Sequence, residues 1–117
     1  MSAHRILVVE DEFIIAIEIA RVLGEAGFAI IGPAGTREAA LRLADEAEID
    51  AALLDASLHG ESVEDVAAAL DRRGIPFLWV TGHGPESLPT ARAPTVVLGK
   101  PFTAEELLEA VRRLVGA

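Results

Sequence analysis

A chain of 117 residues with 51% hydrophobic content and no cysteine is long enough for one domain with a substantial core, and it has neither disulfides nor thiolate metal sites. Its net charge of −9 disfavours direct binding to nucleic acid, because the phosphate backbone repels an acidic surface. No apolar run approaches the roughly 20 residues of a membrane span and no signal-peptide pattern is present, so we expect a single cytoplasmic domain over residues 1–117 with no output domain.

The first half of the chain alternates between short apolar runs and helical segments. The β-branched run at residues 5–9 predicts a strand, and residues 13–26 predict a helix. A second strand is predicted at residues 28–31, and the glycines and proline of residues 32–35 predict a turn. Residues 36–48 predict the next helix, since they begin with a threonine, which suits an N-cap.

The second half of the chain repeats this alternation. Residues 51–54 predict a strand and residues 77–80 another, with a helix over residues 62–73 between them. Ser62 and Asp65 have the types and spacing of a capping pair at the start of that helix.

The last part of the chain completes the predicted sheet. Prolines and glycines interrupt residues 82–94, so any helix there is short. Residues 95–98 predict a fifth strand, and Thr103 with Glu106 predicts a capping box for a final helix. Five apolar strands that alternate with helices indicate a parallel sheet covered on both faces. Right-handed crossovers then favour a doubly wound α/β fold with strand order 2-1-3-4-5.

Polar residues follow four of the predicted strands. They are Glu10 and Asp11 after the first strand, Asp55 after the third, Thr81 after the fourth and Lys100 close behind the fifth. Because the carboxyl ends of parallel strands share one edge of the sheet, we expect these side chains to meet in one crevice. Carboxylates this close repel one another, and their pKa values rise unless a cation neutralises them. Magnesium fits such a site, since it binds one or two carboxylates, keeps water ligands and binds phosphate.

The lysine and the threonine at this edge suit an anion that arrives opposite the metal. They would hold the oxygens of a phosphoryl group while a carboxylate attacks phosphorus, which is a known form of covalent catalysis. Taken singly, each residue has an ordinary alternative: helix-terminal acids, a turn hydroxyl and a solvated loop lysine. The coincidence of all of them at four strand ends favours a phosphoryl-transfer site.

Four motifs resemble the receiver domain of two-component response regulators. They are Ile-Leu-Val-Val-Glu-Asp-Glu at the start, Leu-Leu-Asp-Ala-Ser-Leu in the middle, Val-Thr-Gly after the fourth strand and Lys-Pro-Phe near the end. The resemblance spans nearly the whole chain and is to the stand-alone type of receiver. It implies a flavodoxin-like (βα)5 fold, Mg²⁺ as the cofactor, and a function in phosphorelay signalling rather than turnover of a metabolite.

The resemblance also implies a role for each acidic residue of the predicted site. Asp55 is the phosphoacceptor, and its carboxylate contacts the metal. Asp11 binds Mg²⁺ directly, and Glu10 acts through a water molecule. The main-chain carbonyl of Ser57 is a further metal ligand.

The remaining roles concern the phosphoryl group. The resemblance implies that Thr81 hydrogen-bonds this group after transfer and that Lys100 pairs with it, aimed inward by a cis peptide bond to Pro101. One departure is Val97, which occupies the usual position of an aromatic switch residue in a chain without tyrosine. A valine side chain cannot swing between buried and exposed positions. We therefore hypothesise that residues 82–94 carry the phosphorylation signal by becoming ordered.

A further implication of the resemblance is a partner, a histidine kinase or histidine phosphotransfer protein that docks around the first helix and the loop after Lys100. Two apolar stripes run along that helix. The stripe predicted to face the sheet contains Phe13, Ala16, Ile17, Ala20 and Leu23. The stripe predicted to be the docking surface contains Ile15, Ile19 and Val22. The alternative is a helix that is buried more broadly than usual. An unidentified downstream protein receives the signal.

Two other functions stay open. A phosphorylation-independent interaction module with the same fold is favoured by Val97 and disfavoured by the intact set of acids, threonine and lysine. A metal-dependent phosphohydrolase with an aspartyl nucleophile is less favoured. Such enzymes carry a second acid two residues after the first, where this chain has Ser57, and a cap domain that closes the site.

Overall fold

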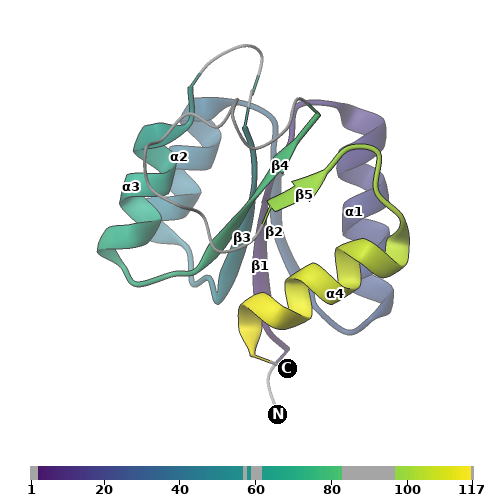
Figure 1. Ribbon diagram of the computed structural model, residues 1–117. Coiled ribbons are helices and arrows are strands. Elements are labelled where there is room, and N and C mark those ends of the chain that lie inside the picture. The colour runs from purple at the N-terminus through teal and green to yellow at the C-terminus, as the bar shows by residue number, and fades with distance from the viewer. Residues whose placement is uncertain (1–2, 57, 59–61, 83–96, 117) are drawn as a thin grey trace.

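The computed structural model describes residues 3–56, 58, 62–82 and 97–116, and within them a five-stranded parallel sheet in the order β2-β1-β3-β4-β5 (Figure 1). The strands are β1 (Arg5–Val9), β2 (Ala29–Ala34), β3 (Ala51–Asp55), β4 (Phe77–Thr81) and β5 (Val97–Gly99). The helices are α1 (Phe13–Glu25), α2 (Arg37–Glu46), α3 (Glu64–Arg72) and α4 (Ala104–Val115). The predicted doubly wound, flavodoxin-like fold and its strand order are confirmed.

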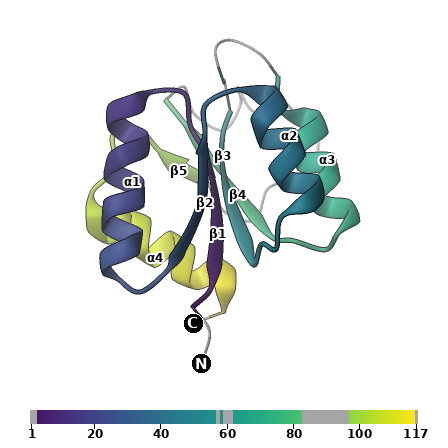
Figure 2. The same ribbon diagram turned by 180° about the vertical axis from the view of Figure 1, so that it is seen from behind.

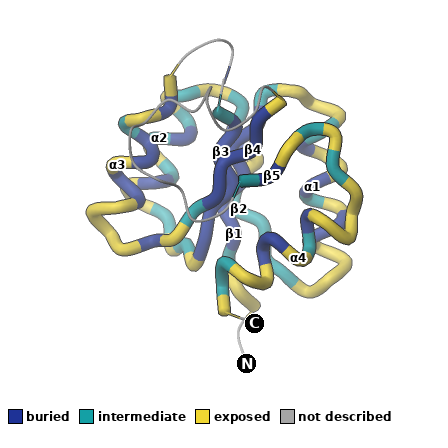
Figure 3. The backbone as a smooth tube through the Cα atoms, viewed as in Figure 1, coloured by how far each residue is buried: buried dark blue, intermediate teal, exposed yellow. Residues whose placement is uncertain are grey.

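Helices cover both faces of the sheet. Figures 1 and 2 show α1 and α4 on one face and α2 and α3 on the other. Alternate residues of β1 point to these two layers, so Ile6 and Val8 pack with α1 and α4 while Leu7 and Val9 pack with α2 and α3. The central strand β3 is buried along its whole length, as Figure 3 shows in dark blue. Its continuous apolar sequence follows from this burial on both faces.

Most of the predicted helix ends are confirmed. The Thr36 hydroxyl accepts a hydrogen bond from the backbone of Ala39, and Thr103 and Glu106 form the predicted capping box. The Ser62 hydroxyl accepts a hydrogen bond of 3.2 Å from the backbone of Glu64, the first residue of α3, so this part of the predicted capping is confirmed. The predicted pairing with Asp65 is wrong, and the N-cap position itself is occupied by a valine without a side-chain cap. That valine is fully buried, so core packing sets where the helix starts. The carboxylate of Asp65 instead forms an ion pair with Arg37 of α2.

The predicted turn at residues 32–35 is also wrong in part, because β2 continues to Ala34. The strand passes Gly32 at a φ of +97°, where a Cβ atom would lie 2.8 Å from the backbone nitrogen of Ala34. The pairing with β1 shifts register between Leu7 and Val9, as at a β-bulge. The carbonyl of Ala34 then accepts a hydrogen bond of 3.0 Å from the backbone of Glu10. This irregular strand end therefore supports the backbone of a predicted site residue.

The first helix is rotated relative to the sequence prediction. Its buried residues are Ala16, Ile19, Val22 and Leu23, whereas Phe13, Ile14 and Ile17 are 75%, 81% and 49% exposed. Ile15 is half-buried against the same core. The predicted docking stripe of Ile15, Ile19 and Val22 is therefore contradicted. Glu18, Arg21 and Glu25 form a polar side of the helix, where they pair with one another, and the buried residues lie away from it. The exposed apolar residues at the start of the helix obscure this pattern, and contact with β2 and α4 fixes the rotation.

Two further predictions can be placed. The Lys100–Pro101 peptide bond is cis, as the family resemblance implied, and so is Gly32–Pro33. The segment at residues 82–94 lies outside the described residues except for Gly82, so the hypothesis about its ordering stays a prediction. In the described part of the chain, no helix has the length and apolar character that crossing a membrane requires.

Candidate functional site

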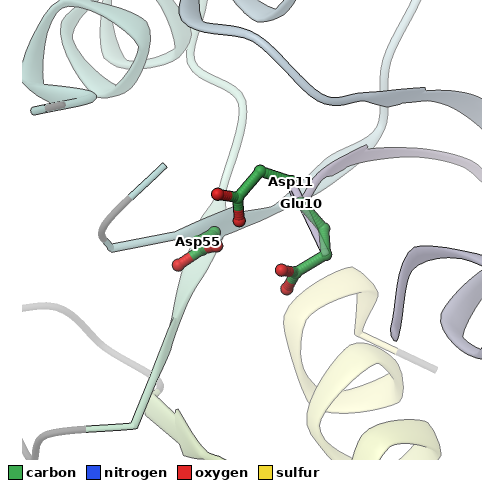
Figure 4. Close-up of side chains that lie close together, drawn as sticks. All are labelled: Glu10, Asp11 and Asp55. Carbon is green, nitrogen blue, oxygen red and sulfur yellow. The ribbon is translucent and has the colours of Figure 1, made fainter. Parts of the chain in front are cut away.

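Three carboxylates meet where β1 and β3 end (Figure 4). Glu10 and Asp11 follow β1 directly, and Asp55 is the last residue of β3. One oxygen from each residue lies within 4.8 Å of the others. Glu10 and Asp55 are only 3% and 5% exposed. The parallel sheet thus brings together acids that are more than forty positions apart in the sequence, as predicted.

Lys100 reaches the same cluster from the end of β5, the edge strand that lies beyond β4. Its ammonium nitrogen lies 3.1 Å from Glu10 Oε1 and 3.7 Å from Asp55 Oδ2. It lies 3.2 Å from Oε1 of Glu12, a residue that the sequence interpretation left without a role. The only signal for Glu12 was its place as the third acid of Glu-Asp-Glu, and acids are ordinary near a helix start.

The fourth strand supplies the remaining polar residue. Thr81 ends β4 and is 4% exposed. Its carbonyl accepts a hydrogen bond of 2.8 Å from the backbone of Lys100, which ties the ends of β4 and β5 together. Asp55 pairs in register with Val80, the residue before Thr81. Asp55 and Thr81 therefore both lie at the carboxyl edge of the sheet. Ser57, the predicted carbonyl ligand, lies outside the described residues.

Burial and mutual repulsion change the acid–base properties of this cluster. Burial raises the pKa of Glu10 to about 7, with the charge of Asp55 as the next cause. Burial alone lowers the pKa of Lys100, but its hydrogen bond to Glu10 and the charges of Glu10 and Asp55 outweigh that effect and raise it. Lys100 therefore stays charged at neutral pH. One ammonium does not balance the surrounding carboxylates, so the site attracts further positive charge.

The donors present fit a hard divalent cation. All three carboxylates offer oxygen, which magnesium prefers over nitrogen or sulfur. Glu10 Oε1 is buried, and the Lys100 ammonium lies 3.1 Å from it as an ion pair without hydrogen-bond geometry. Because the same ammonium also faces Asp55 and Glu12, this oxygen is suited to a further cation or to the water that a cation holds.

Comparison with known proteins shows which family this chain matches. The family model of the response regulator receiver domain matches residues 6–112. The chain is 30% identical to the transcriptional regulatory protein PdtaR of Mycobacterium tuberculosis, over 96% of this chain and 57% of that protein. This chain thus spans little more than half the length of that curated relative.

Solved structures give the same result. SdrG of Sphingomonas melonis Fr1 is similar with a TM-score of 0.84 and 37% identity, over 98% of this chain and 99% of that one. A response regulator receiver protein of Sinorhizobium medicae WSM419 is similar with a TM-score of 0.85 and 26% identity, over 98% of this chain and 96% of that one.

Proposed function

Since this chain belongs to the response regulator receiver domain family, we propose that it accepts a phosphoryl group on Asp55 and signals through changed affinity for another protein. The observation that carries this proposal is the meeting of three carboxylates with Lys100 at one edge of the sheet. Asp55 is the proposed nucleophile because it ends the central strand, between the other acids and the lysine. The donor is proposed to be a phosphohistidine on a histidine kinase or a phosphotransfer protein.

The proposed reaction is a transfer between two protein side chains. A carboxylate oxygen of Asp55 forms a bond to phosphorus while the bond between phosphorus and the donor imidazole breaks. The imidazole keeps that electron pair and takes up a proton from solvent. Lys100 and Thr81 are proposed to bind phosphoryl oxygens as their charge develops. The later hydrolysis of the acyl phosphate returns Asp55 to its carboxylate form.

Magnesium is the proposed cofactor. Asp11 and Asp55 would bind it directly, Glu10 would act through a water molecule, and the carbonyl of Ser57 would complete the protein ligands. When bound, it supplies positive charge that offsets both the carboxylates and the phosphoryl oxygens. The protein's own contribution is to hold Lys100 and the acids in place before the donor arrives.

The test is labelling by a small phosphodonor. With Mg²⁺ and phosphoramidate, we expect mass spectrometry to find one phosphoryl group per chain, mapped to Asp55. Chelation of the metal should prevent labelling, since the acids then repel the anionic donor. A chain that binds Mg²⁺ but is never labelled would favour the phosphorylation-independent interaction module. Steady release of phosphate from a generic ester would favour the phosphohydrolase.

The phosphodonor protein is proposed to dock on the exposed residues at the start of α1. Phe13, Ile14 and Ile17 form this patch, and they follow the site acids directly in the chain. A donor must bring its phosphohistidine to Asp55, so a contact surface beside the site mouth is favourable. The exposed acids beside the patch already have cations of this chain as partners, since Glu12 pairs with Lys100 and Glu18 with Arg21. The patch therefore suits a partner helix mainly through an apolar face.

This docking proposal predicts the effect of Ile14→Glu. The side chain is 81% exposed, so the free energy of unfolding should change by less than about 0.5 kcal/mol. Phosphotransfer from the cognate donor protein should slow by about tenfold, because a charge enters the centre of the contact. The matched control is Ala68→Glu, which makes the same charge change at an exposed position of α3. Equal slowing with phosphoramidate would contradict the docking surface.

A further inference from the structure

We propose that Glu12 is a positioning residue that competes with the phosphoryl group for the Lys100 ammonium and so weakens the phosphorylated state relative to the resting state. This inference rests on the proposed phosphorylation of Asp55 and concerns the regulation of that site. It assigns to Glu12 a role distinct from that of the three clustered acids. The distances, the helix cap and the position of Glu12 outside the acidic cluster support it in turn.

The distances place Lys100 nearer to Glu12 than to Asp55. The ammonium nitrogen is 3.2 Å from Glu12 Oε1, to which it donates a hydrogen bond, and 3.7 Å from Asp55 Oδ2. The Lys100 side chain is 16% exposed and that of Glu12 is 61% exposed. Glu12 thus draws the ammonium toward the mouth of the site. A phosphoryl group on Asp55 must attract the same ammonium in the opposite direction.

The helix cap shows that the Glu12 side chain is not used to cap α1. Glu12 is the N-cap residue of α1, and its side chain makes no cap hydrogen bond. Serine, threonine, aspartate and asparagine are the residues that stabilise an N-cap. The Glu12 backbone donates a hydrogen bond of 3.1 Å to Glu10, while its carboxylate extends to Lys100. The residue is therefore poor as a cap but long enough to hold the lysine.

Glu12 also differs from the other partners of Lys100 in its place. Glu10 and Asp55 belong to the cluster that suits a cation, and Glu12 does not. A cation held by the cluster would weaken the attraction of Glu10 and Asp55 for the ammonium, because it offsets their charge. Glu12 would keep its full attraction. In the state that is ready for phosphorylation, Glu12 is then the main rival of the incoming phosphoryl oxygens.

Beryllofluoride is the probe for this competition, since it forms a phosphoryl-like complex on an aspartate in the presence of Mg²⁺. We expect Glu12→Gln to bind it about threefold more tightly than the wild type, the size of effect typical of an exposed ion pair. Glu12→Ser should bind it more tightly as well and should unfold at a higher temperature, because serine is a better N-cap. Glu18→Gln is the matched control, since Glu18 is an exposed acid of the same helix that pairs with Arg21.

A second measurement observes the lysine directly. Lys100 is the single lysine of the chain, so protein made with ¹⁵N-lysine gives one side-chain ammonium signal. In the magnesium-free protein this signal should shift in Glu12→Gln and stay in place in Glu18→Gln. A purely structural role for Glu12 would move the stability but leave this difference absent.

The outcomes separate the two proposals. A wild type that binds beryllofluoride and is labelled on Asp55, with Glu12→Gln no tighter than Glu18→Gln, overturns the role of Glu12 alone. Weaker binding by Glu12→Gln overturns it too, because Glu12 would then hold Lys100 in its productive position. A wild type that is never labelled and does not bind beryllofluoride overturns the proposed function, and with it this inference.

Discussion

Asp55→Asn is expected to abolish labelling by phosphoramidate and to stabilise the magnesium-free protein by about 1 kcal/mol. Labelling is lost because an amide oxygen is a poor nucleophile toward phosphorus. Stability is gained because the buried Asp55 carboxylate lies within 4.8 Å of oxygens of Glu10 and Asp11, and asparagine removes that repulsion without changing the shape of the side chain. A variant that loses function while the fold gains stability marks a residue kept for its chemistry.

Urea unfolding at pH 8 without Mg²⁺, read by fluorescence of the buried Trp79, measures the stability effect. The matched control is Asp45→Asn, which removes an exposed carboxylate of α2 and should change the stability by less than about 0.5 kcal/mol. Added Mg²⁺ should stabilise the wild type more than Asp55→Asn, since the variant has lost one charged ligand. An Asp55→Asn protein that is labelled as fast as the wild type would contradict Asp55 as the phosphoacceptor.

The magnesium-free protein is expected to lose about 3 kcal/mol of stability between pH 4.5 and pH 8 through Glu10 alone. In the folded state the pKa of Glu10 is about 7, and the ordinary value is 4.5. The folded chain therefore binds this proton more tightly than the unfolded chain. The contribution to stability is fully present below pH 4.5 and disappears as the pH rises through 7. The physical cause is the cost of a charged carboxylate that is 3% exposed and close to Asp55.

Urea unfolding at several pH values, compared with Glu10→Gln, isolates this contribution from those of other groups. The glutamine carries no charge, so the difference in stability between the two proteins should change by the full amount across this range. Mg²⁺ should remove most of the difference at pH 8, because a cation takes over the neutralising effect of the proton. Parallel stability curves for the wild type and Glu10→Gln would show that Glu10 titrates normally.

Both predictions describe a site whose resting state is electrostatically unfavourable. Glu10, Glu12 and Asp55 surround one ammonium, and Asp11 adds a further carboxylate beside Glu10 and Asp55. Burial keeps water from screening the charges of Glu10 and Asp55. A divalent cation stabilises such a site by offsetting the charge of its carboxylates. With that cation bound, the site can receive a phosphoryl group whose negative charge would otherwise be repelled. The instability of the unliganded cluster is thus the physical basis of its proposed affinity for both.

The sequence by itself determined the sheet and the residues that end its strands. Short apolar runs with one acid, hydroxyl or amine behind them leave few arrangements once crossovers are right-handed, so Glu10, Asp11, Asp55, Thr81 and Lys100 were predictable as neighbours. The capping box at Thr103 was equally predictable from the sequence, because it depends on residues three positions apart. These features are local, or follow from local features through the geometry of a parallel sheet.

Only the tertiary structure decided the rotation of α1, the late start of α3 at Glu64, the continuation of β2 past Gly32 and the contact of Glu12 with Lys100. Beyond the polar side of Glu18, Arg21 and Glu25, the surface of α1 is apolar, so packing against β2 and α4 selects which apolar residues are buried. Burial of Val63 sets the start of α3 two residues after Ser62. The Glu12 contact joins residues 88 positions apart through long side chains. Sequence spacing carries no record of such a contact, because its energy arises only after the strands have placed both backbones.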